Sequence, residues 1–226
     1  MAENKDRISI QVGLSGYSFT LEEDDRRTAS GWMGPESVFT VKELQRRYDS
    51  VQMSVFTPYC ALVPEGFVNP LSAREQLADV VRLPEDAVVQ TVDVPDFAAK
   101  LIYSTSIGGT LHKVLAQTVL MSDGNGTTPL PELYYMLRDV LDIPDYNKIL
   151  ASYVDGVLYL VVAQGKTLLL CNSFKAPDFT TAQYFIFMVL KKFQMNPEMS
   201  SITFRTPLNE EQEMSLYRYF KSVERV

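Results

Sequence analysis

Few side chains in this chain of 226 residues are able to carry chemistry, and their types exclude several mechanisms at once. His112 is the sole histidine, so a histidine-rich zinc site and an HExxH motif are impossible, and any histidine-dependent chemistry rests on this one residue. The two cysteines, Cys60 and Cys171, have neither CxxC nor metal-ligand spacing. We therefore expect both to be reduced, packed thiols with a structural role.

Carboxylates are plentiful, but they occur in runs such as residues 22–25 and 210–211. A catalytic carboxylate needs a cleft that shifts its pKa, whereas such runs suit solvated edges and helix N-termini. The loop that begins at Asp123 resembles a calcium loop, but Thr128 replaces the required glycine and Tyr134 replaces the bidentate glutamate. Walker A, GxGxxG and GxSxG motifs do not occur in the sequence. The sequence therefore predicts no metal site and no catalytic residue.

The composition limits the classes of partner. A net charge of −7 argues against a broad nucleic-acid interface, which needs clustered lysine and arginine. No apolar run approaches the ~20 residues of a membrane span, and the most apolar helical stretch, residues 184–190, ends at Lys191 and Lys192. The charged residues 1–7 lack the apolar segment of a secretory signal. We expect a cytoplasmic protein with neither a nucleic-acid nor a membrane partner.

The clearest structural pattern lies in residues 148–172. Three strand-like segments, 149–154, 157–162 and 167–171, are separated by Asp155-Gly156 and by residues 164–166. An Asp-Gly pair tolerates the positive φ values of a type I′ hairpin turn. The middle segment is apolar on both faces, so we expect it to be covered on both sides. The sequence therefore predicts a three-stranded antiparallel meander.

A helix is expected to follow the meander. Thr180 and Gln183 have capping-box spacing and open a predicted helix over residues 181–194. Because this helix is apolar almost all round, it must pack on more than one side. One interpretation places it between the sheet and a neighbouring subdomain, and the alternative makes it a homodimer interface. A strand over 201–205 and a helix capped by Asn209 complete the second half.

The first half shows a similar order of elements. Strands over 8–14 and 17–21 meet at Ser15-Gly16, as in a hairpin. The remaining expected elements are a helix over 40–48, a strand over 51–56, a helix opened by Ser72 and Glu75, a strand over 87–94, a helix over 97–104, a strand over 111–121 and a helix from Pro131. The shared order of hairpin, helix, strand and helix indicates a weak internal repeat. We place the boundary near Ile143-Pro144, giving domains 1–143 and 144–226.

Residues 8–21, residues 168–174, Asp178 and the aromatic helix from Tyr184-Phe185 onward together resemble the DUF3822 family of uncharacterised Bacteroidetes proteins. That family is similar in fold to the superfamily of actin, the sugar kinases and the heat-shock ATPases. The resemblance covers nearly the whole chain. It implies an α/β fold with two ribonuclease-H-like halves, each a mixed sheet opened by an antiparallel hairpin or meander with flanking helices.

The resemblance also implies where phosphate would bind: in the turn that joins the first two strands of each half, through glycine N–H groups and an aspartate. Those turns contain Ser15, Gly16 and Ser18 in the first half, and Asp155 and Gly156 in the second. The first turn has no acidic residue to organise Mg²⁺. In the second, Asp155 stands in a tight hairpin whose geometry calls for that residue in any case.

The family's adenosine-binding glycines are expected after the last strand and helix of the second half, and the chain ends before them, so we expect that half to be truncated. Gly108-Gly109 looks similar but stands in the first half, and we interpret it as a loop pair. The sequence therefore predicts a pseudoenzyme, a non-catalytic binding or scaffolding protein with an unknown protein partner and no cofactor. The alternative is a residual ATPase or kinase-like enzyme that binds Mg·ATP in the cleft between the halves.

Overall fold

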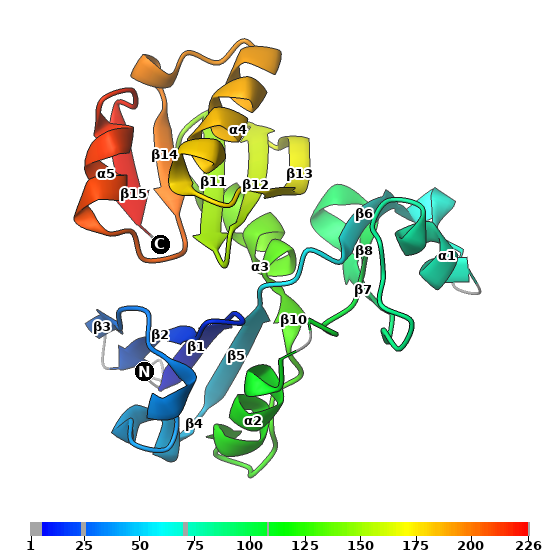
Figure 1. Ribbon diagram of the computed structural model, residues 1–226, viewed down its shortest axis with the longest axis vertical. Helices are drawn as coiled ribbons and strands as arrows, with labels where there is room; N and C mark the ends of the chain where they lie inside the picture. Colours follow the sequence, from blue (N-terminus) through cyan, green and yellow to red (C-terminus); the bar gives the residue numbers. More distant parts are fainter. Residues whose placement is uncertain (1–5, 24–25, 70–71, 108, 226) are drawn as a thin grey trace, which may run out of the picture. The chain divides into compact units, whose positions relative to one another are not determined.

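The structure is a computed structural model that describes residues 6–23, 26–69, 72–107 and 109–225 (Figure 1). Asp24 and Asp25 of the first carboxylate run, Gly108 of the glycine pair and most of the charged N-terminal segment lie outside these residues. The chain divides into two compact units. Unit 1 comprises Met1–Thr57, Asp86–Val88 and Ser104–Glu132, and unit 2 comprises Pro58–Glu85, Val89–Tyr103 and Leu133–Val226.

The sheet of unit 1 has five strands in the order β3-β2-β1-β5-β10. Their bounds are β1 (Arg7–Val12), β2 (Tyr17–Glu23), β3 (Arg26–Ala29), β5 (Ser50–Val55) and β10 (Leu130–Pro131). The first three strands form an antiparallel meander, whereas β5 runs parallel to β1 and β10 runs parallel to β5. The C-terminal ends of β1, β5 and β10 therefore meet along one side of the sheet, which we call the carboxyl edge.

Short elements connect these strands. They are η1 (Pro35–Ser37), η2 (Lys42–Gln45), β4 (Arg47–Tyr48), α2 (Leu111–Thr118) and β9 (Leu120–Met121). The predicted helix over 40–48 is wrong, because the Thr40 hydroxyl donates to the Ser37 carbonyl at 3.0 Å and caps no α-helix, and β4 pairs with β9. The predicted strand over 111–121 is also wrong. Leu111, Leu115 and Val119 recur at helical spacing, and all three pack in the core of unit 1.

The larger sheet of unit 2 repeats this topology, in the order β13-β12-β11-β14-β15. Its strands are β11 (Asn147–Val154), β12 (Val157–Gln164), β13 (Thr167–Lys175), β14 (Ser201–Phe204) and β15 (Ser222–Arg225). An antiparallel meander is again followed by two parallel strands, β14 beside β11 and β15 beside β14. The predicted meander is confirmed, and so is the repeat of two ribonuclease-H-like sheets.

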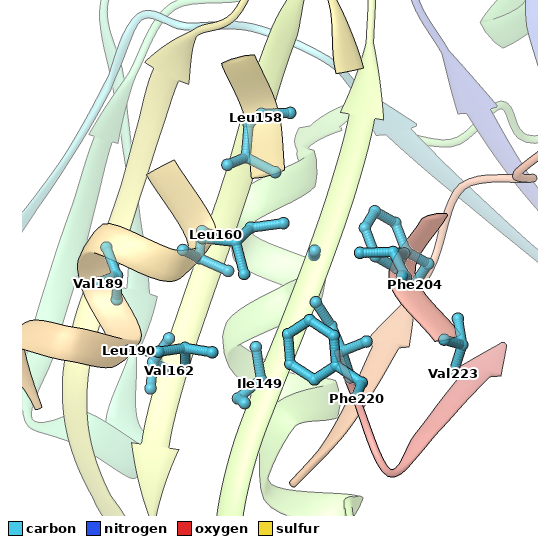
Figure 2. Packing of buried hydrophobic residues seen from close by; sticks show 14 of the residues in the cluster. Ile149, Leu158, Leu160, Val162, Val189, Leu190, Phe204, Phe220 and Val223 are labelled. Carbon is cyan, nitrogen blue, oxygen red and sulfur yellow. The ribbon is translucent and has the colours of Figure 1, made fainter. Parts of the chain in front are cut away.

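One face of this sheet is covered by α4 (Phe179–Lys192) and α5 (Glu210–Tyr217). Figure 2 shows Val189 and Leu190 of α4 directed at Leu160 and Val162 of β12, with Phe204 and Phe220 beside them. The Asp178 side chain, which accepts from the Thr181 amide at 2.7 Å, begins α4 in place of the predicted Thr180. The expected Asn209 cap of the last helix is present as a full capping box with Gln212.

The central strand β12 is buried on both faces, as expected. Behind the sheet, α3 (Glu132–Asp139) leads into η6 (Val140–Asp142), which contacts β11 and β12. The buried Lys148 on β11 donates to the carbonyls of Leu141 and Ile143 at the end of this segment. A lysine in this position satisfies carbonyls that the helix end leaves without intrahelical donors.

A small antiparallel sheet, β6-β8-β7, also belongs to unit 2. Its elements and the remaining short helices are β6 (Cys60–Pro64), η3 (Glu65–Phe67), α1 (Ala73–Ala78), β7 (Gln90–Val94), η5 (Pro95–Phe97), β8 (Ala99–Tyr103) and η7 (Pro197–Met199). The predicted helix over 97–104 is wrong. The left-handed Ala98 ends η5, and Ala99 turns back to pair with Val94. No helix in the described part of the chain is long and apolar enough to cross a membrane.

Candidate functional site

The turn between β1 and β2 closes on itself. Val12 pairs with Tyr17, and the Gly13 amide donates to the Gly16 carbonyl at 2.9 Å across the turn. The Ser15 hydroxyl accepts a hydrogen bond from Trp32 Nε1 at 3.1 Å. Ser15 and Gly16 are thus engaged by the chain's own groups, in the turn where the resemblance would place phosphate.

Gly16 is required by a close approach of another segment. Tyr17 and Met33 exchange two backbone hydrogen bonds, of 2.9 and 2.8 Å. A Cβ on residue 16 would lie 2.0 Å from the Met33 carbonyl oxygen and 3.1 Å from Trp32 Nε1. The backbone at Trp32 and Met33 therefore lies directly against the turn, and only glycine leaves room for it.

The turn between β11 and β12 is a two-residue hairpin. Asp155 has φ 52° and Gly156 has φ 71°, the pair of positive values that a type I′ turn requires. The Gly156 carbonyl accepts from the Ala176 amide at 2.8 Å, which ties the turn to the end of β13. Asp155 and Gly156 thus make the turn that their dipeptide predicts, and they belong to unit 2, whereas Ser15, Gly16 and Ser18 belong to unit 1.

A buried polar network lies at the carboxyl edge of unit 1. Glu132, at 0% exposure, directly follows β10. One of its carboxylate oxygens accepts from Gln11 Nε2 at 3.0 Å, and the other accepts from the Ser54 hydroxyl. The Ser18 hydroxyl donates to Gln11 Oε1 at 3.3 Å. Four polar side chains from β1, β2, β5 and α3 thus form one connected set, and Ser18 is the sequence-predicted site residue that joins it.

The strand register builds this network. Gln11 stands directly opposite Ser18 on one neighbouring strand and Ser54 on the other. A buried carboxylate is costly unless hydrogen bonds replace its water, and the donors from Gln11 and Ser54 do so here. With both oxygens accepting and no exposed surface, Glu132 serves as an acceptor that ties together three strands.

Sequence reasoning missed Gln11, Ser54 and Glu132. Two weak signals were present: a serine within the apolar strand over 51–56, and a glutamate directly after the last strand of the half. At the start of a helix, however, a glutamate is ordinarily a solvated charge that complements the helix dipole. Only the parallel pairing of β5 with β1 and β10 brings the three side chains together.

The other chemistry-bearing side chains stand apart from this network. No disulfide joins Cys60 and Cys171, and burial raises the pKa of both thiols, that of Cys171 to about 12. Neither is a thiolate at neutral pH, as expected for structural cysteines. Burial and the neighbouring Lys113 lower the pKa of His112. No cluster of three histidine, cysteine, aspartate or glutamate residues suited to a metal ion occurs within residues 6–23, 26–69, 72–107 and 109–225.

Two sheets of identical strand order, each a meander followed by two parallel strands, define the class: this is a protein of the actin-like ATPase fold, built from two ribonuclease-H-like halves. The family model of proteins of unknown function, DUF3822, matches residues 2–223. The chain therefore belongs to the DUF3822 family.

A solved structure supports this fold. A protein of actin-like ATPase fold and unknown function from Bacteroides thetaiotaomicron superposes with a TM-score of 0.68 at 14% identity, covering 99% of this chain and 91% of its own. A chain of the PilM–PilN type IV pilus biogenesis complex has a TM-score of 0.44 at 14% identity, covering 97% and 88%. The PPX-GPPA enzyme of Aquifex aeolicus has a TM-score of 0.34 at 9% identity, covering 95% and 73%. No curated protein matches the sequence.

Proposed function

We propose that this protein is a non-catalytic binding or scaffolding protein that has kept the actin-like fold without its chemistry. The observation that carries the proposal is the state of the carboxyl edge of unit 1. There the first turn is closed by its own backbone bond and packed against Trp32 and Met33. A phosphate-binding turn needs N–H groups directed at the ligand, and this packing works against such an arrangement.

The buried carboxylate supports the same proposal. A residue that organises Mg²⁺ or activates water must present an oxygen to the ligand. Both oxygens of Glu132 accept hydrogen bonds from side chains of the sheet, and the residue has no exposed surface. Two cysteines that form no disulfide further support our placement of the protein in a reducing compartment, the cytoplasm.

The test is thermal unfolding with Mg·ATP, with inorganic phosphate in a parallel arm. A ligand present at ~100 times its Kd adds about 2.7 kcal/mol of stability, which in a chain of this size raises Tm by roughly 5–10 °C. We expect no rise in Tm with millimolar Mg·ATP beyond that seen with phosphate alone. A saturable rise specific to the nucleotide would contradict the proposal.

The outer face of α4 is the binding surface that we propose, and a second copy of the chain is its occupant. Tyr184 and Met188 lie four residues apart on one stripe of the helix and are 63% and 41% exposed. Beside them, Phe185 stacks on Phe174, and Phe187 stacks on Phe220. The flanking rings are therefore committed to the fold, while the stripe presents apolar surface.

The charges on α4 favour a pairing with itself. The exposed Asp178 caps its start, and the exposed Lys191 and Lys192 lie in its last turn. Asp178 and Lys191 are 13 residues apart, or ~20 Å along the axis, with Tyr184 near the midpoint. A two-fold axis at Tyr184 would thus bring the start of each antiparallel helix, which carries Asp178, level with the last turn of the other, which carries Lys191 and Lys192. Such self-complementarity is what a two-fold interface requires.

Mass measurement in solution over a range of protein concentrations tests the dimer. We expect a dimer that Tyr184→Glu and Met188→Glu convert to monomer, because each buries a charge at the centre of the interface. Met199→Glu is the matched control, since Met199 is exposed and lies outside α4. A wild-type monomer at every concentration would contradict the homodimer. The non-catalytic proposal would be unaffected, because the test with Mg·ATP decides it separately.

A residual ATPase or kinase-like enzyme is the second candidate. One observation favours it: a carboxylate, an amide and two hydroxyls converge at the carboxyl edge of unit 1. If this set serves a nucleotide, Glu132→Gln should abolish the rise in Tm with Mg·ATP and any hydrolysis. If it serves only the fold, the same substitution changes stability and leaves the response to Mg·ATP flat.

A further inference from the structure

We propose that Asn125-Gly126 is a site of spontaneous covalent modification, at which the backbone amide of Gly126 converts the Asn125 side chain to aspartate and isoaspartate. The pair lies in unit 1, in the loop that joins β9 to β10, and it is the sole Asn-Gly pair in the chain. The inference is independent of the proposed function, because it involves neither the hairpin turns, nor the Glu132 network, nor α4.

The reaction needs no reactant other than water. The Gly126 nitrogen attacks Cγ of Asn125 and loses its proton, an N–Cγ bond forms, the Cγ–Nδ2 bond breaks, and Nδ2 leaves as ammonia. Water then opens the cyclic succinimide. Cleavage of the bond from the nitrogen to Cγ gives aspartate, and cleavage of its bond to the backbone carbonyl carbon gives isoaspartate. Asparagine is thermolabile for this reason, and a following glycine has no side chain to shield the nitrogen.

The attacking nitrogen is accessible and makes no contact that the fold depends on. Asn125 and Gly126 are both exposed. Gly126 forms an isolated antiparallel bridge with Leu120, and the hydrogen bond beside it, of 2.8 Å, runs from the Met121 amide to the Asn125 carbonyl. Within the described residues, the Gly126 amide itself makes no hydrogen bond. The nitrogen can therefore turn toward the Asn125 side chain without breaking a hydrogen bond of its own.

The fold requires a glycine after Asn125. A Cβ on residue 126 would lie 2.7 Å from the carbonyl oxygen of Ala116, in the last turn of α2. Any larger residue would have to displace the loop or the helix end. The residue that makes Asn125 reactive is thus also the one that the close packing against α2 demands.

Asp123 restrains the Asn125 side chain. Its carboxylate accepts from the Asn125 backbone amide and from Asn125 Nδ2, both at 2.8 Å. These two hydrogen bonds lower the pKa of Asp123, so the acceptor is ionised at neutral pH. Donation from Nδ2 holds the carboxamide in place and makes Cγ less electrophilic. Asp123 therefore slows ring closure, which begins when the loop opens locally and this pair of bonds breaks.

Conversion would change how the loop is attached to the rest of unit 1. A carboxylate at position 125 would repel the Asp123 carboxylate, which now accepts from an amide there. In isoaspartate, the added main-chain carbon displaces the residue that now accepts from the Met121 amide. Because Met121 belongs to β9, which pairs with β4, the modified loop should loosen this two-stranded sheet.

Peptide mapping by mass spectrometry of the full chain, incubated folded at mildly alkaline pH, tests the proposal. We expect the peptide with residues 125–126 to show the mass change of an amide-to-acid exchange and to separate into aspartate and isoaspartate forms. Asn172 is the internal control, because it is exposed but held in β13, where the Ser173 amide donates to Asn172 Oδ1 at 2.9 Å. Asn125→Gln is the matched variant, since glutamine would have to close a larger ring, and its peptide should stay unmodified.

Two further samples fix the interpretation. Asp123→Ala removes both restraining hydrogen bonds and should raise the rate of conversion severalfold. The wild-type chain unfolded in urea should react at Asn125, which shows that the chemistry is available. An intact Asn125 in the folded chain, when the unfolded chain has reacted, would overturn the site. So would equal conversion of Asn125 and Asn172, while an Asp123→Ala rate equal to that of the wild type would contradict the restraint.

Discussion

The two large sheets share one strand topology but differ in the connections between their strands and in the side chains that they bury. In unit 2 the crossover from β13 to β14 is the 14-residue helix α4, and the core between sheet and helices is apolar. In unit 1 the crossover from β3 to β5 contains the short helices η1 and η2, and the carboxyl edge buries Glu132 among hydrogen-bonding partners. The pairing order thus defines the fold, while the connections and the edge residues vary independently.

The two hairpin turns differ in the same way. In unit 2, Asp155-Gly156 is a minimal turn whose geometry comes from the dipeptide itself. In unit 1, the four residues from Gly13 to Gly16 depend on a distant segment, because Met33 pairs with Tyr17 beside them. One turn is defined locally and the other by tertiary contact, so substitutions should affect them differently.

The largest expected effect is in the apolar core of unit 2. Phe204→Ala removes a fully buried ring from the cluster between β14 and α4, and should lower the free energy of unfolding by about 3–5 kcal/mol. Urea denaturation measures the change. Met214→Ala on the exposed face of α5 is the control, expected within about 0.5 kcal/mol of wild type. Equal effects from the two substitutions would show that the core assignment is wrong.

Loss of the buried hydrogen bonds at the carboxyl edge of unit 1 should lower the free energy of unfolding. Glu132→Ala leaves the donors of Gln11 and Ser54 without their acceptor, at about 1–3 kcal/mol for each buried donor. The triple variant Gln11→Leu, Ser54→Ala, Glu132→Leu removes donors and acceptor together, and should be more stable than Glu132→Ala alone. Urea denaturation of both variants measures the difference. A single variant as stable as wild type would show that the network contributes little.

The two turn glycines should separate local from tertiary strain. Gly16→Ala places a Cβ against the Met33 carbonyl and should cost about 1–3 kcal/mol, with displacement of the segment at Trp32. Gly156→Ala meets its nearest atoms at 3.6 Å and should cost about 1–2 kcal/mol through its positive φ alone. Fluorescence of Trp32, the sole tryptophan, should change in the first variant and not in the second. An unchanged spectrum in both would contradict the packing at Gly16.

The smallest expected effect is a pH dependence of stability that arises from the N-cap of α4. The crossover from β3 to β5 in unit 1 has no α-helix that corresponds to α4. Hydrogen bonds from Thr181 lower the pKa of Asp178 below its ordinary value of 3.8. The pKa of Asp178 is therefore lower in the folded chain than in the unfolded chain. Its ionised carboxylate stabilises the fold above about pH 4, and this stabilisation is lost as the pH falls through the folded pKa. The unfolding free energies of wild type and Asp178→Asn, compared between about pH 6 and pH 2, measure this loss. The asparagine cap does not titrate, so the wild type should weaken relative to the variant in acid.

By itself the sequence determined the elements whose signals are local. Asp155-Gly156 predicted the meander because that dipeptide is suited to one turn type, and Asn209 predicted the last helix because a cap acts over three residues. The shared order of elements in the two halves and the resemblance to the family predicted the duplicated fold. The division of the chain near residue 143 stays a prediction.

Tertiary structure decided the rest. Residues 99–103 form a strand because β6 and β7 pair with them on both sides, which no signal within the segment specifies. Glu132 is a buried acceptor because parallel pairing brings it to Gln11, 121 residues away. The first hairpin turn is likewise packed against Met33, which pairs with Tyr17; a glycine at residue 16 leaves room for this pairing but does not by itself predict it. In each case the stabilising contact joins residues far apart in the chain, and local propensity carries no information about such a contact.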